Sequence, residues 1–212
     1  VSRRGLDASS LLPYYLSNER FHTKIVRGSP GTTFNDTGEG TMQWKLDATH
    51  TQVGFSVKHM AISTVRGRFS KFDGAGETDD SGKLTAATFT IDAASIDTNQ
   101  EQRDNHLRSA DFFDAEHNPT LTFRSTNITQ NGTDITIAGN FTMRGITKPV
   151  TLKGESSPTV KDPWGMQRTA LTLEGKLNRK DWGLSWNQAL EFGGLIVSED
   201  VRLSIELEAI AA

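Results

Sequence analysis

The sequence predicts an all-β protein built from antiparallel strands. After Trp44, apolar and polar residues alternate in short runs, and this period of two is typical of strands with one buried and one exposed face. Turn-forming sequences such as Asp79-Asp80-Ser81-Gly82 and Asn131-Gly132 separate the runs, which indicates hairpins. The connections are too short for the helical crossovers that parallel strands require. Antiparallel pairing is therefore the expected arrangement.

At least eight strands can be counted in chain order. Phe72 follows one of these runs, breaks its alternation and indicates a bulge. About eight antiparallel strands either close into a barrel or pack as a sandwich, and a barrel of eight is wide enough to hold one thin ligand. The alternating runs are residues 44–48, 53–57, 65–69, 84–92, 120–125, 134–143, 150–154, 169–177 and 200–210.

One segment departs from the strand pattern. Thr98 and Glu101 have the spacing of a capping box, which predicts a short helix over residues 99–111 with Thr98 as its N-cap. Phe112 and Phe113 follow this helix, and we expect them to anchor it to the sheet.

One face of the predicted helix carries both polar and apolar residues. Arg103, His106, Leu107 and Ala110 follow the spacing of one helical face. The helix could be an ordinary surface helix, whose arginine stem lies over apolar neighbours. It could instead cover an opening and direct Arg103 and His106 toward a bound polar group.

The chain divides near Met42. Residues 1–41 have no sustained periodicity and include a turn-rich linker, so we expect a poorly ordered or loosely docked extension followed by a domain over residues 42–212. The net charge of −3 gives no basic field for nucleic acid, and no apolar run is long enough to span a membrane. No signal-peptide core is recognisable, so a cytoplasmic location is expected.

The buried faces of the strands are rich in phenylalanine and poor in hydrogen-bonding groups. This pattern fits a packed core and an apolar pocket equally well. The candidate inward residues are Phe55, Val57, Phe69, Phe89, Ile91, Phe123, Phe141, Met143, Leu171 and Leu173.

Catalytic and metal-binding patterns are weak. The chain has no cysteine, and its five histidines lack the close spacing of metal ligands. The sequence has no nucleophile elbow and no phosphate-binding glycine loop. We therefore predict no catalytic residue, no metal and no cofactor.

Four stretches closely resemble the YceI-like family, also known as polyisoprenoid-binding or lipid-binding domains. The most specific is R-D-x-H-L-x-x-x-D-F-F at residues 103–113, and the family's H-S-x-V-x-F start is here His50-Thr51-Gln52-Val53-Gly54-Phe55. The stretches are LDATHTQVGFSVKHMAISTVRGRF (46–69), IDAASIDTNQEQRDNHLRSADFFDAEHNPTLTFRS (91–125), GNFTMRGITKPVTL (139–152) and LNRKDWGLSWN (177–187).

The resemblance implies a lipocalin-like antiparallel β-barrel whose apolar lumen holds an isoprenoid chain, a polyprenyl quinone or a related amphiphilic lipid. It also implies a homodimer. A non-enzymatic carrier or sensor is the expected function, and an enzyme acting on the head group of an isoprenoid lipid is the alternative.

The polar end of such a ligand needs hydrogen-bond donors at the mouth of the lumen. Arg103 and His106 lie on the stripe of the predicted helix, with Asp104 beside them to orient them. His59 and Arg66, on neighbouring predicted strands, could reach the same rim. We predict that these five residues bind the head group.

Overall fold

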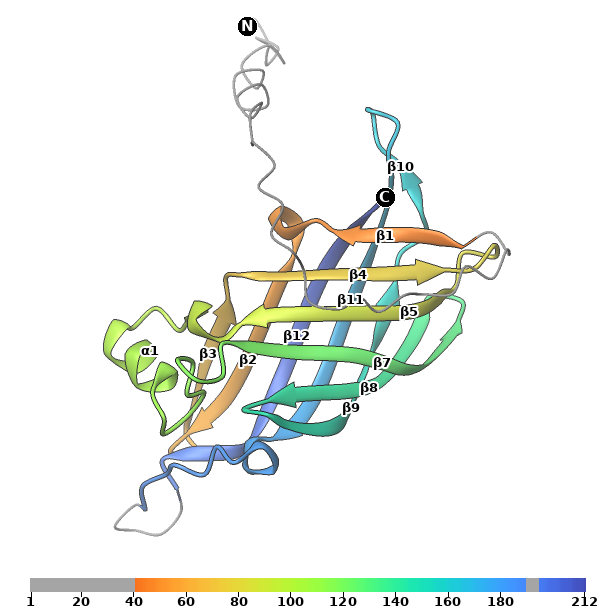
Figure 1. Cartoon of the computed structure of the whole chain (residues 1–212). Coiled ribbons are helices and arrows are strands. Elements are labelled where there is room, and N and C mark those ends of the chain that lie inside the picture. Colours follow the sequence, from red (N-terminus) through yellow and green to blue (C-terminus); the bar gives the residue numbers. More distant parts are fainter. Residues whose placement is uncertain (1–40, 190–194) are drawn as a thin grey trace, which may run out of the picture. The chain divides into compact units, whose positions relative to one another are not determined.

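The computed structural model describes residues 41–189 and 195–212. Its strands form one antiparallel sheet that closes on itself through the pairing of β11 with β12 (Figure 1). The elements are β1 (Met42–Leu46), β2 (Gln52–His59), β3 (Ser63–Phe69), β4 (Phe72–Thr78), β5 (Leu84–Asp92), β6 (Ile96–Asp97), α1 (Glu101–Arg108), β7 (Thr120–Asn131), β8 (Asp134–Met143), β9 (Ile146–Ser156), β10 (Val160–Lys161), β11 (Gln167–Asn178) and β12 (Val197–Ala211).

The barrel has eight strand positions, and two of them hold two successive strands each. β1 and β2 follow one another along the same side of β12, with Trp44 opposite Ala211 and Val53 opposite Ile205. β4 pairs with β1, and β3 pairs with β2. The other six positions are β5, β7, β8, β9, β11 and β12, each paired with the next. The predicted all-β antiparallel barrel is confirmed.

The strand break at Phe72 is not the bulge that the sequence predicts. β3 ends at Phe69 and pairs with β2 and β6, whereas β4 begins at Phe72 and pairs with β1 and β5. The alternation breaks because the chain changes its pairing partners there. The ring of Phe72 then stacks on that of Phe89, with 5.8 Å between the ring centroids.

The helix is present, but α1 is shorter than predicted and has a different cap. Gln100 is the N-cap, and its side chain accepts a hydrogen bond of 2.5 Å from the backbone N–H of Arg103. Thr98 instead donates its N–H and its hydroxyl to the buried carboxylate of Asp104, at 2.9 and 2.5 Å. Asn99 has a left-handed φ of 58°, so the chain turns before the helix begins and the predicted capping box cannot form.

The segment that contains β6 and α1 joins β5 to β7 at one end of the barrel (Figure 1). Phe112 is buried, and Phe113 packs edge-on against Phe69 with 5.7 Å between the centroids. The contact with Phe69 of β3 confirms that Phe113 anchors the helix to the sheet, and Phe112 joins the core. No helix of the described residues is long and apolar enough to cross a membrane. The predicted extension lies outside those residues except for Thr41.

Candidate functional site

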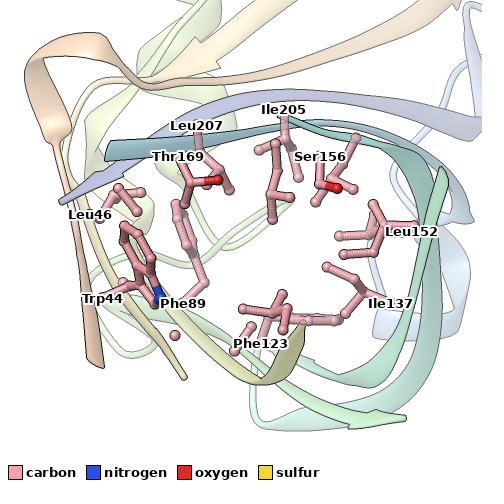
Figure 2. Close-up of a pocket in the computed structure, with 18 of the residues that line it drawn as sticks. Trp44, Leu46, Phe89, Phe123, Ile137, Leu152, Ser156, Thr169, Ile205 and Leu207 are labelled. Carbon is pink, nitrogen blue, oxygen red and sulfur yellow. The ribbon is translucent and has the colours of Figure 1, made fainter. Parts of the chain in front are cut away.

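A cavity of about 710 Å³ fills the part of the barrel near the β4–β5 and β7–β8 hairpins; we call it the hairpin-end cavity. All eight strand positions contribute side chains to it, because every strand turns alternate residues inward. Figure 2 shows Trp44, Phe89, Phe123, Ile137 and Leu152 pointing into this space. The lining is mostly apolar, and a void of this size is far larger than the packing gaps of an ordinary core.

A second cavity of about 570 Å³ lies beneath α1; we call it the helix-end cavity. Its walls come from β2, β3, β7, β8, β11, β12, α1, the residues on either side of α1 and the residues that follow β11. Phe112 and Trp186 pack together in its wall with 5.3 Å between the ring centroids, and His106 meets both rings edge-on.

The two cavities lie next to each other inside the barrel and share part of their walls. Five side chains line both: Phe55, Phe69, Leu121, Phe141 and Leu203. Three of the five are phenylalanines and two are leucines, so the junction is apolar and largely aromatic; the ring centroids of Phe55 and Phe69 are 5.7 Å apart. Each volume is in the range of small-molecule binding sites. The arrangement is suited to an elongated apolar ligand.

Apart from the exposed Asp80, the described polar groups that line the hairpin-end cavity are neutral, and two pairs of them are hydrogen-bonded to each other. Trp44 donates its indole N–H to the hydroxyl of the buried Thr78 at 3.0 Å. Gln130 donates its side-chain amide to Ser156 at 2.9 Å.

A family model for the YceI-like domain matches residues 44–209. The chain belongs to the YceI-like domain family. The UPF0312 protein of Staphylococcus aureus (strain N315) is 38% identical over 165 residues, which cover 77% of this chain and 94% of that protein. The UPF0312 protein of Pseudomonas aeruginosa (strain LESB58) is 37% identical over 170 residues, which cover 79% of this chain and 86% of that protein.

Solved structures share the fold of this YceI-like domain. The Campylobacter jejuni YCEI protein is 31% identical with a TM-score of 0.64, and the match covers 78% of this chain and 95% of that one. Burkholderia cenocepacia BcnA is 22% identical with a TM-score of 0.66, over 77% and 98% of the two chains. A polyisoprenoid binding domain from Saccharophagus degradans is 17% identical with a TM-score of 0.55, over 80% and 98%. The last two likenesses concern the fold alone.

All ten predicted lumen residues of the YceI-like domain line a cavity. Val57 and Met143 line the helix-end cavity, and Phe55, Phe69 and Phe141 line both cavities. The remaining five line the hairpin-end cavity: Phe89, Ile91, Phe123, Leu171 and Leu173. The strand pattern leaves open whether these residues form a packed core or line a pocket. In the structure they line a pocket.

The five predicted head-group residues have different positions. His59, Arg103 and His106 line the helix-end cavity. Asp104 is the buried residue of α1, and its carboxylate accepts hydrogen bonds from the N–H and the hydroxyl of Thr98.

The fifth of these residues, Arg66, is exposed on the outer face of β3. Its neighbour Val65 lines the helix-end cavity, and successive residues of a strand face opposite sides. The placement of Arg66 at the rim of the lumen is therefore wrong.

Sequence reasoning missed several lining residues. The alternation that selects Phe141 and Met143 also selects Ile135 and Ile137, which are both 2% exposed and line the hairpin-end cavity. Arg179 lines the helix-end cavity and is 3% exposed. Arg179 lies in the sequence N-R-K-D-W, whose charged residues are typical of an exposed turn. The sequence therefore does not indicate that its side chain is buried.

Asp47, His50 and Glu208 bring three possible metal-ligand atoms within 4.8 Å of one another outside the lumen. Arg168 already donates to Asp47 at 2.9 Å and to Glu208 at 2.6 Å. Burial opposes the charge on Asp47, but hydrogen bonds from Thr49, His50 and Arg168 outweigh it and hold the pKa of that carboxyl well below its usual range. The hydrogen bond to Asp47 also raises the pKa of His50. Arg168 therefore already bridges both carboxylates of this cluster and also pairs with Asp162.

Proposed function

We propose that this YceI-like domain binds one amphiphilic isoprenoid or other long-chain lipid inside its barrel and carries or senses it without changing it chemically. A polyprenyl quinone is one candidate ligand. The observation that carries the proposal is the pair of adjoining apolar cavities that share Phe55, Phe69 and Phe141 in their walls. A compact ligand would fill one cavity, whereas a long chain can occupy both.

The energetics favour a hydrocarbon tail. Burial of each CH₂ group stabilises the complex by about 0.8 kcal/mol in gross terms. Ordering of the chain and loss of translational freedom reduce the net gain, so affinity does not grow in proportion to tail length. A tail that fills both cavities should still dissociate slowly and remain bound during purification.

The comparisons support a binding role. One structural relative is a polyisoprenoid binding domain, and it shares the barrel fold. Membership of the YceI-like family adds to this support. The inference to this chain rests on its own cavities, because that relative is only 17% identical.

Extraction of the natively purified protein with organic solvent, followed by mass spectrometry, tests the proposal. We expect about one lipid per chain, chemically unmodified, and its replacement by added lipid of the same class. Failure to recover a lipid, together with failure of the emptied protein to bind prenyl or long-chain lipids, would overturn the proposal. Turnover of an added prenyl lipid would favour an enzyme instead.

A further inference from the structure

The two cavities differ in the charge of their linings. Among the described residues, those that line the helix-end cavity include Arg103, Arg179, His59 and His106 and no carboxylate. Those that line the hairpin-end cavity include no Arg, Lys or His, and their one carboxylate belongs to the exposed Asp80. The residues that line the helix-end cavity are therefore the more basic of the two sets, and of these His106 is paired with the carboxylate of Asp111 at 2.9 Å.

Arg179 is the most deeply buried of these four residues. Its Nε donates to the carbonyl oxygen of Ser198 at 3.0 Å, and its Nη1 donates to that of Leu184. Its Nη2 is buried without a hydrogen-bond partner in the described part of the chain. The carboxylate of Glu199 is bonded to Lys180, 2.5 Å from the lysine Nζ. Burial lowers the pKa of Arg179, and the charge of Glu199 offsets only part of that effect.

A buried charge without a bonded counterion is costly, by several kcal/mol in proteins. Arginine does not escape this cost by losing its proton, because its guanidinium stays charged. The low dielectric of the apolar wall also lets this charge act across the cavity. An anion in the helix-end cavity would therefore be stabilised by Arg179 without having to touch it.

Two further polar side chains that line the cavity can bond directly to a ligand. Arg103 donates from its Nε to the hydroxyl oxygen of Thr98 at 2.7 Å and from its Nη2 to the carbonyl oxygen of Thr98 at 2.8 Å. Its Nη1 is left for another acceptor. The ring of His59, which is half-buried, also lines this cavity. Its nitrogens add a donor or an acceptor.

We propose that the helix-end cavity recognises an anionic head group, a carboxylate or a phosphate, and that the apolar tail extends past the aromatic junction into the hairpin-end cavity. Arg179 supplies the charge and Arg103 a direct hydrogen bond. The inference rests on the proposed function, since it assigns the direction and the head-group class of the lipid bound there.

Pairs of ligands with the same tail isolate the head group. Lipid-free protein is titrated with farnesol and farnesyl phosphate, and with 1-hexadecanol and palmitate, in competition with a fluorescent lipid probe at fixed pH and salt. We expect each anion to bind at least about tenfold more tightly than its alcohol. A larger ratio for one pair distinguishes a phosphate from a carboxylate site.

Substitutions test which residues cause the preference for an anionic head group. Arg179→Gln should reduce the ratio toward one while the affinity for the alcohols stays nearly unchanged, and Arg179→Lys should retain the preference. Arg103→Gln should reduce the ratio by itself, which gives a second test if Arg179→Gln does not fold. Arg124→Gln, an exposed position on the outer face of β7, is the matched control and should keep the wild-type ratio.

Equal binding of acids and alcohols by the wild-type protein would overturn this inference and leave the proposed lipid binding intact. An unchanged ratio in both Arg179→Gln and Arg103→Gln would also overturn it. Failure of all four lipids to bind would contradict the proposed function as well.

Discussion

Replacing Phe123 with Asp would place a carboxylate in the wall of the hairpin-end cavity. Phe123 lies on β7 between Phe89 of β5 and Phe141 of β8, and its ring points into the lumen (Figure 2). Its neighbours along the strand, Thr122 and Arg124, are exposed on the outer face. The substitution therefore tests the assignment of faces as well as the nature of the lumen.

Two effects add up in Phe123→Asp. Loss of the ring removes up to about 3 kcal/mol of apolar burial, and less here because the side chain is only partly buried. Desolvation then raises the pKa of the new carboxyl above about 3.9, and each unit of that rise costs about 1.4 kcal/mol at neutral pH. The folded state holds the proton more tightly than the unfolded state. The loss of stability therefore grows as the pH rises from about 3.9 to the raised pKa and is constant above it.

Urea unfolding at about pH 4 and about pH 7, together with lipid extraction, measures these effects. The difference in unfolding free energy from the wild type should be larger at the higher pH for Phe123→Asp and independent of pH for Phe123→Asn. We expect Phe123→Asp to lose its lipid at neutral pH. Thr122→Asp should stay close to the wild type. A Phe123→Asp protein with wild-type stability and full lipid content at neutral pH would refute the assignment.

Three further outcomes are expected. Asp104→Ala leaves two donors of Thr98 unpaired, so the free energy of unfolding should fall by about 1–3 kcal/mol, measured by urea unfolding. Arg103→Ala should reduce lipid retention, measured by mass spectrometry, more than it lowers the melting temperature; the reverse order would make Arg103 a purely structural residue. Asp47→Asn should destabilise the protein at neutral pH, because the ionised Asp47 accepts from Arg168 and the pKa of its carboxyl is lowered. The wild type loses this contribution as the pH falls below about 4. The free energies of unfolding of the wild type and of Asp47→Asn, measured by urea unfolding, should therefore converge in acid.

The sequence determined the identity of the inward faces, because alternation in a strand is local. Phe123 and Phe141 carry this signal within a few residues, and both line the lumen. The helix was also predicted from a local signal, but the residue at which it begins was not predicted correctly. Thr98 has the spacing of an N-cap, yet its hydroxyl bonds to Asp104 because the chain turns at Asn99.

Tertiary structure decided what the alternating pattern leaves open. Whether inward phenylalanines fill a core or line a cavity depends on the closure of β11 onto β12, which sets the width of the barrel. The same closure gives the cavities their volumes, and the segment around α1 encloses one of them. The burial of Arg179 also arises from contacts distant along the chain, since the carbonyl of Ser198 holds its guanidinium. Spacing reports which side of an element a residue faces, whereas the space on that side is set by strands far away in the sequence.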